Sequence, residues 1–154
     1  MSTSGQIRAA AERDCDAIAG LIAELRSDEG RASRDRAIVA NVVRSALDGP
    51  VTSVWVAEEA GAVRGFIVVH WLPCPMLGGH EAYISDLIVG RDARGQGLGR
   101  RLIAAAESEA RRRSCVRLML NNRVAAESFR RAFYPKLGFR VREEFANLVK
   151  VLRR

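Results

Sequence analysis

The stretch Arg94-Gly95-Gln96-Gly97-Leu98-Gly99, called the glycine stretch below, decides how the rest of the sequence is interpreted. Its three glycines alternate over five positions, and the apolar spacing of a helix begins directly after them. Glycine accepts positive φ angles and lets a ligand come close to the main chain. The first amides of a helix are unpaired and carry partial positive charge. The stretch therefore predicts a site for an anion such as a phosphate or a pyrophosphate.

The spacing of the glycines excludes two common phosphate-binding motifs. A P-loop requires Gly-x-x-x-x-Gly-Lys-Ser/Thr, and no Lys-Ser or Lys-Thr pair follows here. The dinucleotide fingerprint requires Gly-x-Gly-x-x-Gly, whereas here the third glycine comes one position early. The pattern that remains is Arg-x-x-Gly-x-Gly, formed by Arg94, Gly97 and Gly99.

Hydrophobic spacing on both sides of this stretch predicts a mixed α/β domain. Helices are expected after Asp14 and after Ser33, which can serve as N-caps, from Leu98 onward, and around Phe133, where Pro135 ends or bends the helix. The middle strands should pair antiparallel, and the strand–helix–strand unit around the glycines should be a right-handed parallel crossover. The predicted strands cover residues 7–10, 51–59, 63–72, 83–89, 115–120, 138–141 and 148–152.

Length and charge limit the classes of function. A chain of 154 residues predicts one domain over residues 1–154. The 25 Lys and Arg against 18 Asp and Glu give a net charge of +7, which attracts nucleic acid, acidic membranes or a phosphorylated cofactor. Nearly all of these cations are arginine, which suits phosphate recognition. The arginines lack the interleaved aromatic residues of single-strand binders, so no specific nucleic-acid partner is expected.

Cysteine usage and hydropathy predict a cytoplasmic protein. Cys15, Cys74 and Cys115 lie far apart without Cys-x-x-Cys spacing, which argues against a disulfide framework or a zinc site. The first residues contain no apolar core of a signal peptide. No apolar run approaches the roughly 20 residues that span a bilayer. We therefore expect neither a metal nor a membrane partner.

Residues 83–89 (YISDLIV), 91–93 (RDA) and 94–103 (RGQGLGRRLI) together resemble the acetyl-CoA-binding core of the GNAT superfamily of N-acetyltransferases. Residues 133–139 (FYPKLGF) resemble the second hallmark of that family, F-Y-x-x-x-G-F. Ile7-Arg8 before the acidic start of a helix at Asp14 resembles its usual opening. The similarity extends over the whole chain in the order and spacing of elements. It implies a GNAT-like α/β fold with a mostly antiparallel sheet, a parallel splayed pair and about four helices.

The resemblance also implies where acetyl-CoA binds. The main chain of Leu87, Ile88 and Val89 would pair with the pantetheine arm, and Asn122 would hydrogen-bond it, with Asn121 as the alternative. No metal is implied. The residues implied to hold the pyrophosphate are Arg94, Gly95, Gln96, Gly97, Leu98, Gly99 and Arg100.

The implied chemistry is direct transfer of the acetyl group to a primary amine of a small molecule or a peptide, since no cysteine is placed as an acyl carrier. Tyr134 matches the family tyrosine that protonates the departing CoA thiolate, which a phenol can do. Many members carry Glu where Ser85 stands, and Ser85 is a poor base. Asp86 is the candidate base, and the alternatives Glu81, His70 and water stay open.

A catalytically weak acetyl-CoA-binding or sensing module of the same fold is the alternative function. The sequence leaves the acetyl acceptor unidentified and does not choose between a monomer and the homodimer that is frequent in this family.

Overall fold

The computed structural model describes residues 5–152. The chain forms two compact units, Met1–Asn121 and Asn122–Arg154, and each is described by itself. The single domain that the chain length suggests stays a prediction.

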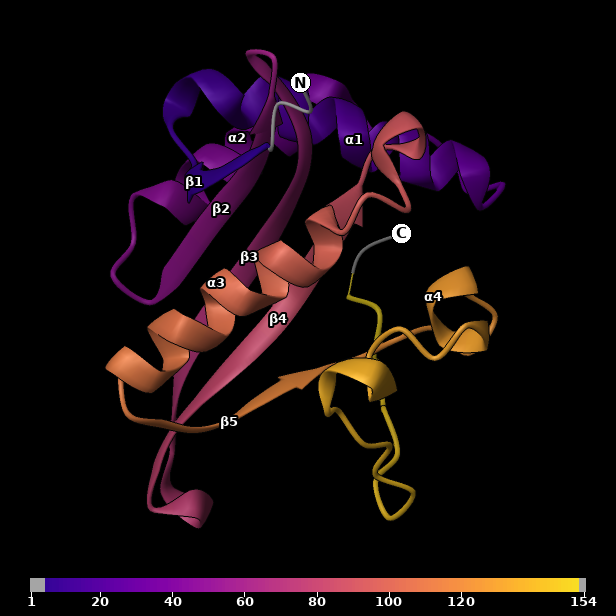
Figure 1. Ribbon diagram of the computed structural model, residues 1–154. Helices are drawn as coiled ribbons and strands as arrows, with labels where there is room; N and C mark the ends of the chain where they lie inside the picture. The colour runs from indigo at the N-terminus through magenta and orange to yellow at the C-terminus, as the bar shows by residue number, and fades with distance from the viewer. Residues whose placement is uncertain (1–4, 153–154) are drawn as a thin grey trace. The chain divides into compact units, whose positions relative to one another are not determined.

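The first unit is built on one five-stranded sheet with the order β1-β2-β3-β4-β5 (Figure 1). Neighbouring strands from β1 to β4 pair antiparallel, and β4 pairs with β5 in parallel. Both the antiparallel meander and the parallel crossover around the glycine stretch are confirmed. The strands are β1 Gln6–Ala9, β2 Thr52–Glu59, β3 Ala62–Cys74, β4 Gly79–Val89 and β5 Cys115–Leu120.

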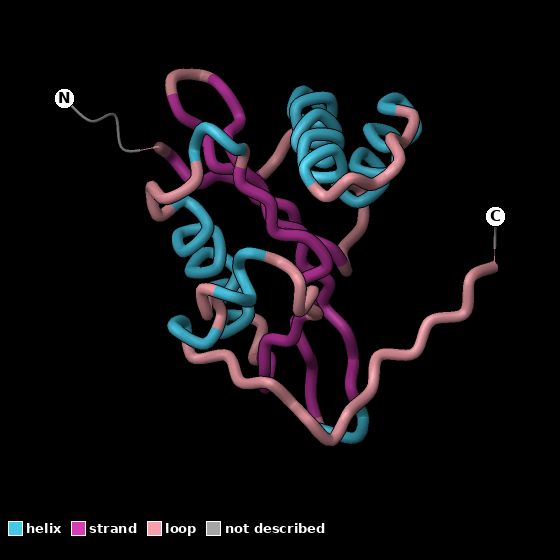
Figure 2. The backbone as a smooth tube through the Cα atoms, turned by 90° about the vertical axis from the view of Figure 1, so that its right-hand side faces the viewer, coloured by secondary structure: helices cyan, strands magenta, loops and turns pink. Residues whose placement is uncertain are grey.

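Helices cover both faces of this sheet (Figures 1 and 2). Helices α1 (Cys15–Asp28) and α2 (Arg36–Leu47) lie on one face, and α3 (Leu98–Arg112) lies on the other. Alternate side chains of a strand point to opposite faces, so each face has its own core. The core under α1 and α2 contains Cys15, Ile18, Ala19, Ala40, Val43, Val54, Val56, Phe66, Val68 and Ile88. Fully or almost fully buried residues on the α3 side include Ile67, Val69, Ala82, Ile84, Leu98, Leu102, Ile103 and Ala106.

Two irregularities of β4 determine where functional groups lie. A β-bulge between β3 and β4 leaves Ser85 without a register partner, because Val68 pairs with Asp86 and Val69 pairs with Ile84. The pairing of β4 with β5 ends at Ile84 and Leu120. From Ser85 to Val89, β4 therefore runs on beyond its parallel neighbour, which is the splay that the resemblance implies.

Two predicted helix caps differ from the structure. Asp14 precedes α1, but its carboxylate accepts from the Ala11 amide (2.8 Å) and from Arg8 instead of the helix amides. An ion pair with a nearby guanidinium outcompetes a backbone cap at this position. The second helix is capped by Asp35, whose carboxylate accepts from two amides at 2.8 and 3.1 Å, and not by Ser33.

Within its described residues, the second unit contains one short helix, α4 (Glu127–Arg130), and a 3-10 turn at Pro135–Leu137. The predicted helix around Phe133 is wrong in extent, because Ala132 takes a left-handed φ of 54° and ends it. The strands predicted at 138–141 and 148–152 are also not found. Apolar β-branched residues form a strand only when a ladder pairs their backbone. Here Leu148 and Leu152 are almost fully exposed.

Candidate active site

The outer edge of β4 carries open backbone groups. The amide of Gly90 donates to the Arg64 carbonyl at 2.8 Å, and alternation along an antiparallel ladder then directs the amide and carbonyl of Ile88 toward β3. The amides and carbonyls of Leu87 and Val89 consequently face the side that β5 no longer covers. Nε of Arg94 donates to the Val89 carbonyl at 3.1 Å. Leu87 thus offers both groups to an extended ligand, and Val89 offers its amide.

The glycine stretch forms the turn that the sequence predicts. Gly95 and Gly97 have φ angles of 78° and 79°, and a Cβ added to either residue would meet no atom within 4 Å. Gly97 is the N-cap of α3, and the first helical backbone bond runs from the Arg101 amide to the Gly97 carbonyl. Leu98 buries its side chain in the core, whereas Gly99 and Arg100 lie in the first turn with outward amides. The turn therefore leads into amides that the helix leaves unpaired, which are the groups that bind an anion.

An acidic helix end lies against the arginines beside this turn. Asp28, the last residue of α1, pairs with Arg91 and, at 3.2 Å, with Arg94. Glu24 accepts the backbone amide of Arg91 at 2.6 Å. The hydrogen bond from Arg91 holds the pKa of Asp28 below its ordinary value. Gln96 donates to the Asp92 carbonyl within its own loop at 3.3 Å.

The base candidates separate into two groups. Glu81 is 6% exposed and pairs with Arg117 of β5, so its carboxylate is already committed to an ion pair. Asp86 is exposed and accepts from the Ser85 hydroxyl at 2.7 Å. Ser85 Oγ also lies 3.0 Å from Nε2 of His70. The structure thus connects Asp86 and His70 through Ser85, whereas the carboxylate of Glu81 is paired with Arg117.

The remaining candidates belong to the second unit, except Asn121. The amide nitrogen of Asn121 donates to the Tyr83 hydroxyl at 3.2 Å, within the first unit. The side-chain oxygen of Asn122 accepts from the Ser128 hydroxyl at 3.1 Å, which leaves its amide hydrogens for another partner. Tyr134 packs edge-on against Phe133 and Phe139, with ring centroids 5.0 and 5.7 Å away. Burial among these rings raises the pKa of Tyr134 and keeps its phenol protonated.

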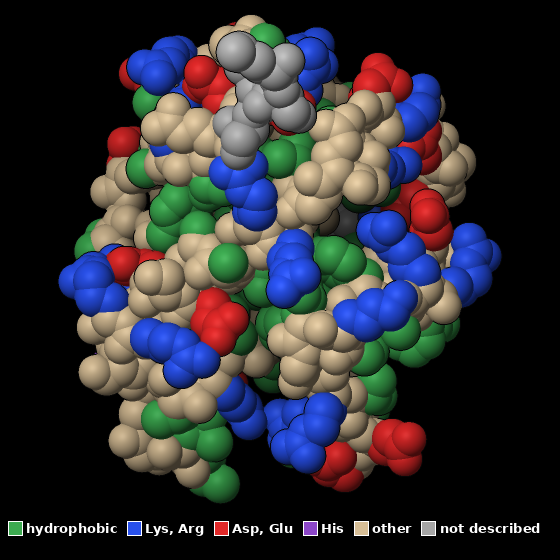
Figure 3. Space-filling model, viewed as in Figure 1, with side chains coloured by type: hydrophobic (Ala, Val, Ile, Leu, Met, Phe, Trp, Pro, Cys, Tyr) green, Lys and Arg blue, Asp and Glu red, His purple; other side chains and the backbone are tan. Residues whose placement is uncertain are grey.

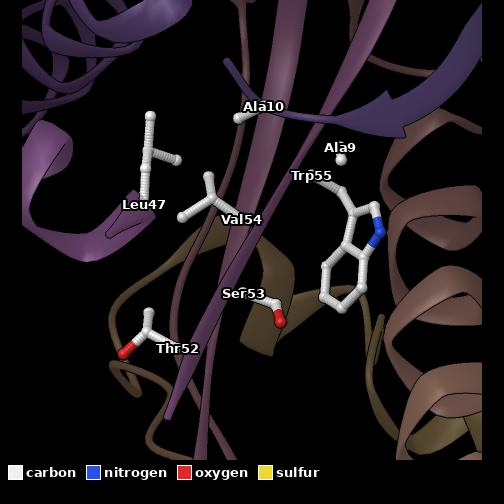
Figure 4. Close-up of a pocket in the computed structure, with 7 residues that line it drawn as sticks. All are labelled: Ala9, Ala10, Leu47, Thr52, Ser53, Val54 and Trp55. Carbon is white, nitrogen blue, oxygen red and sulfur yellow. The ribbon is translucent and has the colours of Figure 1, made fainter. Parts of the chain in front are cut away.

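A shallow hollow of about 200 Å³ lies beside β2, past the end of β1 (Figure 4). Ala9, Leu47 and Val54 form part of its apolar lining, and Thr52 and Ser53 add hydroxyls. Thr52 lines this hollow and also contacts a base candidate, because its hydroxyl lies 3.1 Å from Nδ1 of His70. None of the sequence-predicted site residues lines the hollow.

Part of the positive charge of α3 is balanced within the helix. Figure 3 shows blue cations spread over the face seen in Figure 1, with red carboxylates beside some of them. Arg111 pairs with Glu107, and Arg112 and Arg113 both pair with Glu109. Across residues 5–152, no cluster of three or more His, Cys, Asp or Glu side chains could hold a metal ion. In the same part of the chain, no helix has the length and apolar character needed to cross a membrane.

The sequence profile of the acetyltransferase (GNAT) family matches residues 12–139. That range includes the splayed β4 edge, the glycine turn and Tyr134. The chain belongs to the acetyltransferase (GNAT) family. Membership implies acyltransferase activity. A comparison with curated protein sequences found no match.

Solved structures with the same fold cover nearly the whole chain. A transcriptional regulator from Bacillus halodurans C-125 has 21% identity and a TM-score of 0.82 over 95% of this chain and 99% of its own. A ribosomal-protein-alanine N-acetyltransferase from Brucella melitensis biovar Abortus 2308 has 22% identity and a TM-score of 0.78 (96% and 99%). A possible acetyltransferase from Clostridium difficile 630 has 18% identity and a TM-score of 0.82 (97% and 99%). At these identities the likeness shows the GNAT fold alone.

Sequence reasoning missed two residues that the structure adds to the site, and it did not predict that Asp28 pairs with Arg91 and Arg94. Thr52 and Tyr83 lie on β2 and β4 beside His70, and only the strand register could have placed them there. The alternation of side chains along a predicted strand indicates on which face of the sheet Thr52 and Tyr83 lie, but it does not indicate which residue of the next strand each one contacts.

Proposed function

We propose that this GNAT-family chain is an N-acetyltransferase that uses acetyl-CoA and transfers the acetyl group directly to a primary amine. The observation that carries the proposal is one continuous path of groups on β4 and α3. It runs from the exposed Asp86, along the open groups of Leu87 and Val89, to the glycine turn.

The residues present fit acetyl-CoA. The turn at Gly95 and Gly97 leaves its backbone open and precedes the positive end of a 15-residue helix, which suits a pyrophosphate. The outer groups of Leu87 and Val89 suit the amides of a pantetheine arm, which binds like an added strand. When bound, acetyl-CoA would supply the activated acyl thioester. Arg94, Gly95, Gln96, Gly97, Leu98, Gly99 and Arg100 are proposed to surround the pyrophosphate, and Asn122 to bind the pantetheine.

Two side chains are proposed to move protons. Asp86 accepts a proton from the acceptor amine, because its carboxylate is exposed and Glu81 is engaged elsewhere. Tyr134 gives its phenolic proton to the leaving sulfur, and its raised pKa keeps that proton available. Direct transfer is favoured because no cysteine is implicated in the site. All three cysteines are free thiols, in keeping with the cytoplasmic location that we propose.

The acceptor is proposed to be a small-molecule or peptide amine, without a specific nucleic-acid or membrane partner. A homodimer is a further proposal that sedimentation can test. The names of the similar structures range from a transcriptional regulator to an enzyme acting on ribosomal-protein alanine, so they do not choose an acceptor.

Thiol release from acetyl-CoA, measured with a panel of amines, tests the proposal. The panel comprises spermidine, an aminoglycoside, free amino acids, a peptide with an N-terminal alanine and a lysine peptide with a blocked N-terminus. Acceleration by at least one amine, with a mass gain of one acetyl group on it, supports the enzyme. CoA binding without turnover on any amine supports the sensing module instead, and neither binding nor turnover rejects both.

A further inference from the structure

Four hydrogen-bonded side chains form a row across β2, β3 and β4 that ends at the proposed base, Asp86. The Thr52 hydroxyl lies 3.1 Å from Nδ1 of His70, and Nε2 of His70 lies 3.0 Å from the Ser85 hydroxyl. Ser85 in turn donates to Oδ2 of Asp86 at 2.7 Å. Every link is within hydrogen-bond distance, and both ring nitrogens of His70 are used.

The β-bulge explains why Ser85 and Asp86 can belong to the same row. Consecutive residues of a regular strand point to opposite faces. Because Ser85 has no register partner, it turns to the face of Asp86 and reaches His70. Bulges re-aim side chains in this way beside active sites. The face concerned is that of α1 and α2, since Asp86 is level with Val68 of their core.

The direction of the hydrogen bonds follows from the charge of Asp86. An ionised carboxylate only accepts, so the single hydrogen of Ser85 points to Asp86. Ser85 can then only accept from His70, which places the ring hydrogen on Nε2 and leaves Nδ1 to accept from Thr52. Within the described chain, Oδ1 of Asp86 has no protein partner and is left for the substrate.

We propose that Asp86, Ser85 and His70 act as one proton-accepting unit, in which Asp86 is the catalytic residue and Ser85 and His70 are positioning residues. This inference rests on the proposed acetyl transfer. An N–H bond of the amine breaks, its electron pair stays on nitrogen, and an O–H bond forms at Oδ1 of Asp86. The exposed carboxyl then returns the proton to water.

The charge of His70 controls how strongly Asp86 accepts a proton. A second proton on Nδ1 forces the Thr52 hydroxyl to turn, and the positive ring strengthens the pull of Ser85 on Oδ2. A carboxylate stabilised by a hydrogen bond and a nearby cation holds a proton less well. Asp86 is therefore the better base while His70 is neutral. Tyr83 of β4 also faces His70, and the centroids of the two stacked rings are 6.3 Å apart.

Nitrogen-15 NMR of the ligand-free protein tests the hydrogen bonds between Thr52, His70, Ser85 and Asp86 without any turnover. The protein has two histidines, and His80 serves as the internal reference. We expect neutral His70 to carry its hydrogen on Nε2. In Asp86→Asn and in Ser85→Ala, the titration midpoint of His70 should move to lower pH while that of His80 stays. A hydrogen on Nδ1, or an unchanged midpoint in both variants, overturns the proposal.

The pH dependence of kcat/KM, with one amine from the panel, tests the catalytic part. Imidazoles change charge between about pH 5 and 8. In His70→Gln, the glutamine side chain can still donate a hydrogen bond but does not titrate. We expect kcat/KM to rise with pH through this range in the wild type and in the control His80→Gln, by roughly fivefold more than in His70→Gln. Ser85→Ala should lose the step as well, and Ser85→Thr should restore it.

The two proposals fail in different ways. If His70→Gln and His80→Gln give the same profile while the wild type turns over, the proton-accepting unit is wrong and acetyl transfer stands. If the wild type turns over no amine, the proposed function is wrong, and the NMR titration still decides whether the three side chains are coupled.

Discussion

Asp28 pairs with Arg94 at 3.2 Å, and this ion pair connects the end of α1 to the glycine stretch. The same carboxylate also holds Arg91. Guanidinium groups bind carboxylates and phosphates with the same hydrogen-bonding geometry. Asp28 is therefore in competition with any phosphate that approaches these two arginines.

Asp28→Asn is expected to tighten the binding of CoA by about threefold to tenfold, because it removes a competing anion from two arginines. Isothermal titration with CoA at low and high salt measures the effect, which should shrink as salt screens the charges.

Asp48→Asn is the matched control for this prediction, since Asp48 is exposed at the end of α2 and loses the same charge. If CoA binding weakens in Asp28→Asn alone, then Asp28 orients the arginines for the ligand instead of competing with it.

Gly97→Ala is expected to lower the free energy of unfolding by about 1 kcal/mol, because a side chain at a left-handed φ is strained even where space is free. It should also weaken CoA binding by displacing the amides at the start of α3. Urea unfolding and CoA titration measure the two effects.

The control for Gly97 is Gly49→Ala, at another glycine where a Cβ meets no atom within 4 Å but where φ is not left-handed. Gly49→Ala should leave stability unchanged within about 0.5 kcal/mol. Equal stability losses in both variants would mean that the turn carries no conformational strain.

The sheet of the first unit was predictable because its strands are apolar and bounded by turn residues. Residues 115–120 were predicted as a strand and form β5 with those bounds. The prediction of strands at 138–141 and 148–152 was wrong because β-propensity describes how well a residue fits a paired, half-buried surface. The exposed side chains of Leu148 and Val149 show that a run of residues with high β-propensity need not be paired. The cap at Ser33 failed because Asp35 stands two residues later and offers a stronger acceptor.

The site was predictable where local sequence determines it. The turn at Gly97 and the helix start at Leu98 follow from glycine spacing alone. The pairing of Glu81 with Arg117 joins residues 36 positions apart, and it depends on the parallel register of β4 and β5. No local pattern contains that register, so the sequence could not predict this ion pair. The bulge at Ser85 was hidden for the same reason.

Tyr134→Phe is expected to lower kcat by roughly 10²–10⁴-fold while acetyl-CoA affinity is largely kept, because only the proton donor is removed. Burial raises the pKa of Tyr134, so the folded state keeps its phenol protonated above the ordinary range. The stability that this residue contributes is complete below the unfolded pKa of about 10 and is lost as pH rises through the folded pKa.

Steady-state kinetics and CoA titration of the same preparation separate these effects. An unchanged kcat in Tyr134→Phe would remove Tyr134 from the mechanism. In the alkaline range, unfolding midpoints of the wild type should fall with pH more steeply than those of the variant.

Asp14→Asn is expected to destabilise the first unit by about 2 kcal/mol at neutral pH, because a carboxylate with a side chain 4% exposed loses its pairing with Arg8. The loss is moderated since Arg8 keeps Glu58 at 2.5 Å. The hydrogen bond from Arg8 lowers the pKa of Asp14 below 3.8, so its stabilisation is present above about pH 4 and is lost as pH falls through the folded pKa. Urea midpoints from pH 7 to pH 2.5 should converge for the two proteins at the acid end, whereas the exposed control Asp16→Asn should follow the wild type throughout. A constant difference across that range would show that Asp14 stabilises the fold through packing instead of charge.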